Sequence, residues 1–150
     1  MTWSIGRLGA LACVAVVAAV AIDALAQTGL EPVRLTPDDL GWGGDASAVR
    51  RVNIAGDNQM PGLYAYRARF PDGFRNQPHF HPDDRIVTVI SGTLQMGYGE
   101  RFDERALRAL PAGSVWTEPG NQPHFVWARD GEVIIQVVGI GPSGTTQVQP

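Results

Sequence analysis

The sequence predicts an all-β domain, and three observations support this fold class. Its 18 glycines and 11 prolines separate short apolar runs, as turns separate strands. Residues 62–70 alternate, with Tyr64 and Phe70 on one face and Arg67 on the other, as expected of a half-buried strand. Residues 132–140 form a long apolar run that suits a buried strand. Together these features indicate a β domain with many turns.

The other elements are predicted in chain order from local signals. Residues 35–42 suit one helical turn, with Thr36 as its N-cap and Pro37 in its first position. Residues 103–110 are predicted to be the one clear helix, because Asp103 can cap it and apolar residues recur on one side. The predicted strands are 62–70, 74–81, 85–90, 93–99, 114–118, 124–128 and 132–140, with one short strand in the tail.

Residues 1–26 are predicted to be a secretory signal peptide. One cation, Arg7, precedes an apolar run of about 15 residues, and a small-x-small cleavage site follows. A transmembrane anchor is the alternative, but a span needs roughly 20 residues. A lipoprotein would use Cys13, which lies inside the run. The mature chain is then one domain, residues 27–150, in the periplasm or secreted, with no membrane contact after cleavage.

Composition excludes several function classes. The mature chain would have no cysteine, because Cys13 leaves with the signal peptide, so thiol chemistry is excluded. All 12 cationic residues are arginine, which excludes Schiff-base catalysis by lysine. The net charge is −3 with acids and arginines interspersed, so no nucleic-acid partner is expected.

The three histidines of the chain suggest a metal site. His79 and His81 are two residues apart, so on a strand they point to the same face. His124 follows a proline, as His79 does. A third imidazole from a distant strand would close a site for a divalent metal and leave coordination positions open. The alternative is a set of histidines satisfied by hydrogen bonds without a metal.

At these residues the sequence resembles the cupin superfamily. The first cupin motif has two glycines, a His-x-His pair and a glutamate at fixed spacing. Gly73, His79, His81 and Gly92 fall on four of these positions. Arg85 stands where the glutamate is expected.

The second cupin motif matches less completely. Gly113, Pro119 and His124 fit its spacing. Asn121 stands in a glycine position, which is a mild departure because asparagine tolerates left-handed backbone geometry. Ala128 stands where the motif has asparagine. The resemblance covers most of the mature chain.

The resemblance implies a double-stranded β-helix, or jelly-roll, barrel with one short helix between the two motifs. It implies that His79, His81 and His124 bind Fe(II), Mn(II), Ni(II), Cu(II) or Zn(II). Many cupins pair through their sheet faces, so a homodimer is also expected.

Arg85 leaves three arrangements open. An inward cation weakens metal binding unless an anion compensates for it. An anionic substrate would supply that charge and pair with the guanidinium. Alternatively, Arg85 turns away to pair with Asp83 or Asp84. In the third arrangement one of these aspartates replaces the missing glutamate.

Three further residues are candidates for binding substrate. Trp116 and Glu118 share one face of a strand, and Gln136 lies in the middle of the last long strand. Glu118 would serve as an acid/base group or as an additional ligand. Core packing for Trp116, solvent exposure for Glu118 and a backbone hydrogen bond for Gln136 are the alternatives.

Three functions remain open from the sequence. The first is a small-molecule metalloenzyme, an oxidoreductase of the dioxygenase type, or a hydrolase with zinc. The second is a non-catalytic periplasmic cupin that binds or senses a small anionic ligand. The third is a structural domain with a vestigial site.

Overall fold

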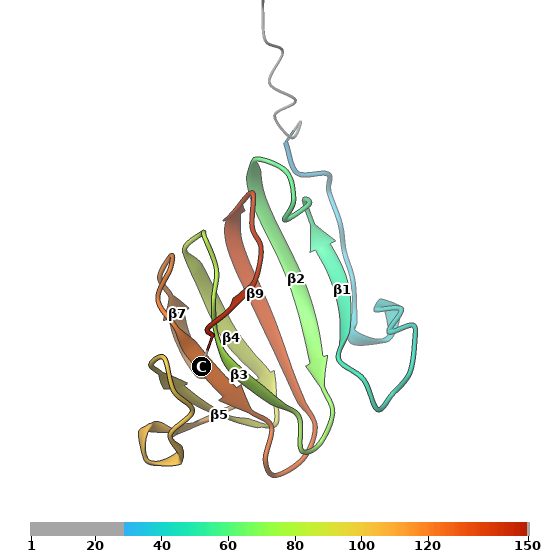
Figure 1. Ribbon diagram of the computed structural model, residues 1–150. Coiled ribbons are helices and arrows are strands. Elements are labelled where there is room, and N and C mark those ends of the chain that lie inside the picture. The colour runs from blue at the N-terminus through green and yellow to red at the C-terminus, as the bar shows by residue number, and fades with distance from the viewer. Residues whose placement is uncertain (1–28, 150) are drawn as a thin grey trace, which may run out of the picture.

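The computed structural model describes residues 29–149, and these form two antiparallel β-sheets that face each other (Figure 1). The predicted signal peptide lies outside the described residues. The strands are β1 (Arg50–Ala55), β2 (Gly62–Phe70), β3 (Arg75–Phe80), β4 (Arg85–Ser91), β5 (Thr93–Tyr98), β6 (Arg108–Pro111), β7 (Val115–Glu118), β8 (His124–Trp127), β9 (Val133–Gly141) and β10 (Thr146–Gln147). The only helices in this part of the chain are single 3-10 turns, η1 (Pro37–Asp39) and η2 (Glu104–Ala106).

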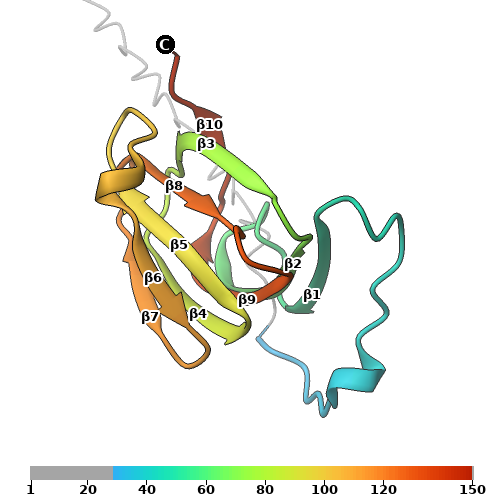
Figure 2. The ribbon, with the colours of Figure 1, turned by 90° about the horizontal axis from the view of Figure 1, so that it is seen from below.

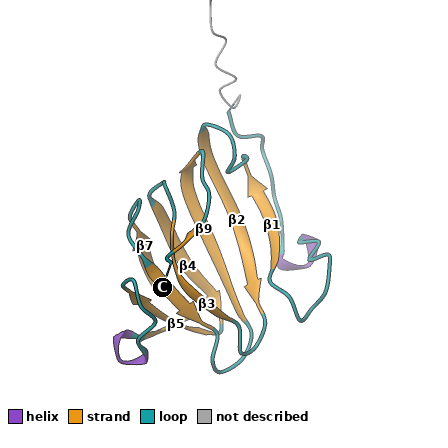
Figure 3. Cartoon of the chain, in the orientation of Figure 1, coloured by secondary structure: helices purple, strands orange, loops and turns teal. Residues whose placement is uncertain are grey.

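The two sheets have five strands each and make a jelly-roll barrel that is not closed. One sheet has the order β1-β2-β9-β4-β7, and the other has β10-β3-β8-β5-β6. The view from below shows the two sheets on opposite sides of the interior (Figure 2). Strands dominate the cartoon, and the two helical turns lie at its periphery (Figure 3). The predicted all-β jelly roll is therefore confirmed.

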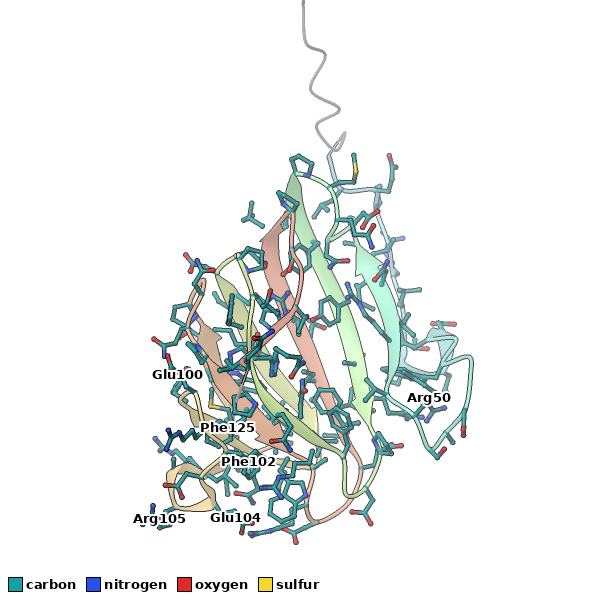
Figure 4. The ribbon with its side chains drawn as sticks, in the orientation of Figure 1. Arg50, Glu100, Phe102, Glu104, Arg105 and Phe125 are labelled. Carbon is teal, nitrogen blue, oxygen red and sulfur yellow. The ribbon has the colours of Figure 1, made fainter. Side chains whose placement is uncertain are left out.

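The core between the sheets comes from the alternation of the strands. In β2, Tyr64, Tyr66, Ala68 and Phe70 are buried, as the sequence pattern predicts. Buried residues of β4 and β9 lie beside them on the inner face of the same sheet, and residues of β5 and β8 pack against them from the other sheet. A smaller aromatic contact outside this core joins Phe102 and Phe125, whose ring centroids are 4.7 Å apart (Figure 4).

The predicted helix over residues 103–110 is wrong for most of its length. Asp103 does cap a turn, because its side chain accepts a hydrogen bond from the Arg105 N–H. The helix ends at Ala106, and β6 then pairs with β5. An isolated eight-residue helix is marginal, so hydrogen bonding to a sheet edge overrides the local helical preference.

The sequence predicts the helical turn η1 but not the strand β1. Strand β1 is not among the predicted strands, although its burial alternates over Arg50–Ile54. It is an edge strand that pairs with β2, with a bulge between Asn53 and Ala55. The helical turn at η1 is confirmed, and Asp39 accepts hydrogen bonds from the Thr36 N–H and hydroxyl. Among the described residues, no helix is long and apolar enough to cross a membrane.

The motif residues Gly92 and Asn121 both occupy left-handed backbone conformations. Gly92 has φ +78° in the turn between β4 and β5. Asn121 has φ 60°, as its place in the second motif predicts. Its N–H donates to the carbonyl of His81 at 2.7 Å, so this turn supports the strand end that carries a candidate ligand.

Replacing Gly92 by alanine is expected to lower the free energy of unfolding by more than Gly113→Ala does. Both positions have a positive φ, which costs a side-chain-bearing residue about 1–3 kcal/mol. A Cβ at Gly92 would also lie 2.4 Å from the Glu132 carbonyl oxygen, whereas a Cβ at Gly113 meets nothing within 4 Å. Denaturant unfolding of both variants checks this, and equal losses would contradict the steric contribution.

Candidate metal centre

The three histidines converge inside the barrel. His79 and His124 are directly opposite each other in the pairing of β3 with β8, and their ring centroids are 4.4 Å apart. His81 follows β3, and its ring centroid lies 5.1 Å from that of His79. All three are buried, and one ligand nitrogen from each lies within 4.8 Å of the others. The group can therefore hold a metal ion.

Backbone carbonyls orient all three rings in the same way. In each histidine, Nδ1 lies at hydrogen-bonding distance from a carbonyl oxygen. The oxygens belong to Gln77, Gly144 and Gln122, at 2.8, 2.6 and 3.1 Å from His79, His81 and His124. A carbonyl oxygen only accepts, so Nδ1 carries the ring proton and Nε2 keeps its lone pair. This tautomer is the one that metal-binding histidines use when a second group fixes the ring.

Burial favours the uncharged form of two of the rings, those of His79 and His81. Burial lowers the pKa of His79 below its ordinary value. Burial, reinforced by the nearby Arg85 cation, lowers the pKa of His81 to about 4. Neutral imidazoles are the form that binds metal, so the donor set suits a divalent transition ion.

The side chain of Arg85 points into the barrel and is buried. Its Nε donates to Asp83 at 3.4 Å, its Nη1 donates to the Tyr66 hydroxyl at 3.4 Å, and its Nη2 donates to Ser143. These contacts occupy all three guanidinium nitrogens. Arg85 therefore does not turn away, although it pairs with Asp83 as the second arrangement expected.

The two aspartates before Arg85 have different partners. Asp83 is buried and accepts a hydrogen bond from the Tyr64 hydroxyl. Burial acts to raise the pKa of Asp83, but hydrogen bonds from Ser143 and Tyr64, with the Arg85 charge, lower it overall. Asp84 instead accepts from the Gly120 N–H at 2.7 Å and holds the turn after β7.

Glu118 brings a carboxylate to the histidines from β7. It is buried, with Oε1 3.3 Å from His124 Nε2 and Oε2 3.6 Å from His81 Nε2. Trp116 is also buried, and its indole N–H donates to Glu118 Oε1 at 3.2 Å. Burial acts to raise the pKa of Glu118, but His124, His81 and Arg85 together hold it below its ordinary value. The carboxylate is therefore ionised at neutral pH, and it is not at a solvated strand end.

A cavity of about 170 Å³ adjoins this centre. Polar groups of the site form one wall, including His79, His81 and Glu118. The remaining wall is mostly apolar or aromatic and comprises Val49, Tyr66, Ala68, Phe70, Trp116, Val126, Ile135 and Val137. Arg51 also lines the cavity while remaining exposed, so it marks the side that opens to solvent.

Of the predicted substrate-binding residues, Gln136 is not brought to this cavity. Its neighbours Ile135 and Val137 point inward, so Gln136 lies on the outer face of β9, where its side chain accepts from Arg67 at 3.1 Å. The alternation of side chains along β9 predicts this outward position of Gln136.

Several residues of the site are not predicted by the sequence patterns. Tyr64 and Tyr66 contact Asp83 and Arg85, and their alternation on β2 could have indicated an inward position. Ser143 and the Gly144 carbonyl come from the segment before β10, which carries no local signal. Only the pairing of β10 with β3 explains their position beside the histidines.

Comparisons with known proteins identify the fold. A family model described as "Domain of unknown function (DUF4437)" matches residues 39–150. No curated protein matches the sequence significantly.

Solved structures with the cupin fold are similar to the chain. KdgF from Halomonas sp. is 20% identical with a TM-score of 0.58, and the match covers 74% of this chain and 96% of that one. An RmlC-like cupin from Shewanella frigidimarina is 15% identical with a TM-score of 0.56, covering 75% and 94%. Oxalate oxidase, solved with the substrate analogue glycolate, is 25% identical with a TM-score of 0.53, covering 70% and 59%.

Proposed function

Because the chain belongs to the DUF4437 family and has the cupin fold, we propose that it is a metal-dependent oxidoreductase acting on a small carboxylate. The observation that carries the proposal is the common orientation of the three rings. In each ring Nδ1 faces a backbone carbonyl, which leaves Nε2 as the nitrogen that can bind a metal. One ligand nitrogen from each ring lies within 4.8 Å of the others, and Nε2 of His79 is also 3.3 Å from the Asn76 side-chain nitrogen. His79, His81 and His124 would hold Fe(II), Mn(II), Ni(II), Cu(II) or Zn(II), whose identity the donor set leaves open.

When bound, the ion would supply open coordination positions beside the cavity and redox chemistry toward dioxygen. The chain's own residues supply the rest. Tyr66, Phe70 and Trp116 form an apolar wall that excludes water from the cavity. Arg85 is occupied by internal partners, so the cation available to attract a carboxylate is Arg51.

Size and similarity support a small carboxylate as the substrate class. The cavity, about 170 Å³, is below the usual range of drug-sized ligand pockets. Oxalate oxidase, one of the similar structures, was solved with glycolate bound. Its chain is much longer than the matched part, so its activity supports the proposal by analogy only.

Metal analysis followed by a substrate panel tests the proposal. We expect the protein purified from its own compartment to contain about one ion per chain, and dioxygen uptake to require both the metal and a small carboxylate. Tight binding of a carboxylate without turnover would instead favour the non-catalytic periplasmic binding cupin. Absence of metal, with stability unchanged by a chelator, would favour the vestigial domain.

Replacing Arg51 by glutamine is expected to weaken carboxylate binding about tenfold, with kcat nearly unchanged. Arg51 lies at the open side of the cavity, and its guanidinium carbon is 3.4 Å from the Tyr66 ring centroid. From this position it would attract the carboxylate to the cavity without contributing to metal binding. Arg67→Gln is the matched control, because Arg67 lies on the outer face of β2. An unchanged KM in Arg51→Gln would contradict this role.

The homodimer and the periplasmic or secreted location remain predictions. Exposed apolar residues support an interface on the outer face of the first sheet; they include Leu63 of β2, Ile86 of β4, Val115 of β7 and Ile140 of β9. Light scattering of the mature protein would give the assembly, and sequencing of the exported protein would give the cleavage site.

A further inference from the structure

The carboxylate at the centre lies directly across the strand pair from the cation. Arg85 of β4 and Glu118 of β7 are paired residues, and both side chains point into the barrel. Arg85 Nη1 lies 3.7 Å from Glu118 Oε2. The cupin motif places a carboxylate at position 85. Here an arginine occupies that position, and the carboxylate comes from the adjacent position on the neighbouring strand.

Glu118 lies against the ring nitrogen of His124 that points away from its backbone carbonyl. Nδ1 of His124 faces a carbonyl, so in the neutral ring Nε2 is an acceptor. Nε2 is buried and has no hydrogen-bond partner within residues 29–149, yet Glu118 Oε1 lies 3.3 Å away. A cation between these two atoms, either a proton or a metal ion, relieves their repulsion. The rings of His79 and His81 converge on the same place, which favours a metal ion.

The distances suit a metal ion as that charge. Two adjacent ligands on one ion, at bond lengths of about 2.1 Å, lie about 3.0 Å apart in octahedral geometry, which leaves two further positions open, and about 3.4 Å apart in tetrahedral geometry. The carboxylate oxygens are 3.3 Å from His124 Nε2 and 3.6 Å from His81 Nε2. Glu118 is therefore placed as a neighbouring ligand on the same ion as the two imidazoles.

Other groups hold the carboxylate in this orientation. The Trp116 indole N–H donates to Oε1, and Arg85 lies beside Oε2. Outer contacts of this kind fix the direction of a ligating carboxylate. Arg85 is held in turn by Asp83, Ser143 and Gly144. The arginine thus supports the carboxylate rather than replacing it.

We propose that Glu118 is the fourth metal ligand of this centre and that Arg85 positions it. The ligating carboxylate then lies on β7, whereas the cupin motif has its glutamate at the position of Arg85 on β4. This inference rests on the proposed three-histidine metal site. It also lowers the net charge of the buried site, because a divalent ion, the Arg85 guanidinium and the Asp83 carboxylate together carry two positive charges and Glu118 reduces this to one.

Titration of metal-free protein with Co²⁺ tests the assignment, with affinity and the visible spectrum as readouts. In Glu118→Gln the Co²⁺ affinity is expected to fall about 100-fold and the spectrum to change, because a charged ligand is lost. Glu118→Asp keeps the negative charge but moves the carboxylate oxygens away from the histidines. The Co²⁺ affinity of this variant should therefore fall at least about tenfold. Glu104→Gln is the control, since Glu104 lies at the outer edge of the molecule (Figure 4) and is exposed.

The thermal midpoint of each metal-free variant reports folding separately from binding. If Glu118→Gln does not fold, Glu118→Asp carries the same test. Wild-type affinity and spectrum in the folded Glu118 variants would overturn the assignment and leave the three-histidine site intact. Failure of the wild-type protein to bind Co²⁺ would instead refute the proposed metal site itself.

Discussion

Replacing His124 by alanine is expected to abolish tight metal binding and the stabilisation that accompanies it. Saturating metal at 1,000 times its Kd stabilises the native state by about 4 kcal/mol, and a variant that binds no metal loses all of this. His124 is the least exposed of the three rings and lies in contact distance of both His79 and Glu118. Thermal melts with and without added Zn²⁺ measure the effect.

His79→Ala and His81→Ala should behave like His124→Ala, because one ligand nitrogen from each ring lies within 4.8 Å of the others. The chain has no fourth histidine to serve as a matched control. The metal-free form of each variant therefore provides the reference and separates lost packing from lost metal. A single-histidine variant that keeps the full metal-induced shift in Tm would contradict a site shared by the three residues.

Replacing Arg85 by methionine is expected to lower the free energy of unfolding by about 3–5 kcal/mol. Methionine keeps much of the buried volume but removes the charge. Asp83 and Glu118 would then be two buried carboxylates without their shared cation. Denaturant unfolding of the metal-free protein measures the loss directly.

Arg105→Met is the matched control for this substitution. Arg105 also pairs with an aspartate, but its side chain is 90% exposed and lies at the outer edge of the molecule (Figure 4). Solvent screens such a pair, so no measurable loss is expected. The double variant Asp83→Asn with Arg85→Met should recover part of the stability, because one buried charge is removed with its partner. A loss in Arg85→Met no greater than in Arg105→Met would contradict a structural role for the buried cation.

The sequence determined the parts of the site that depend on local geometry. Residues two apart on a strand share a face whatever the rest of the fold does, so His79 and His81 could be paired from spacing alone. The left-handed conformation of Asn121 is likewise a property of one turn. The spacing of the two motifs then linked His124 to the other two histidines, and the structure places it beside them.

The tertiary structure decided what depends on pairing between distant segments. The register of β4 against β7 sets Glu118 opposite Arg85, and no local pattern gives that register. The same holds for residues 108–111, where pairing with β5 overrides helical preference, and for Ser143 and Gly144, which the pairing of β10 brings to the histidines.

The tertiary structure therefore determines which groups balance the charge of Arg85 beside the histidines. Motif spacing places Arg85 at the candidate metal centre, but the sequence does not show which groups balance its charge. The fold supplies Asp83 and Glu118 as the compensating carboxylates, the second of them from another strand. Electrostatic balance in a buried site is a sum over all groups that the fold brings together, so it becomes visible only when the strands are assembled.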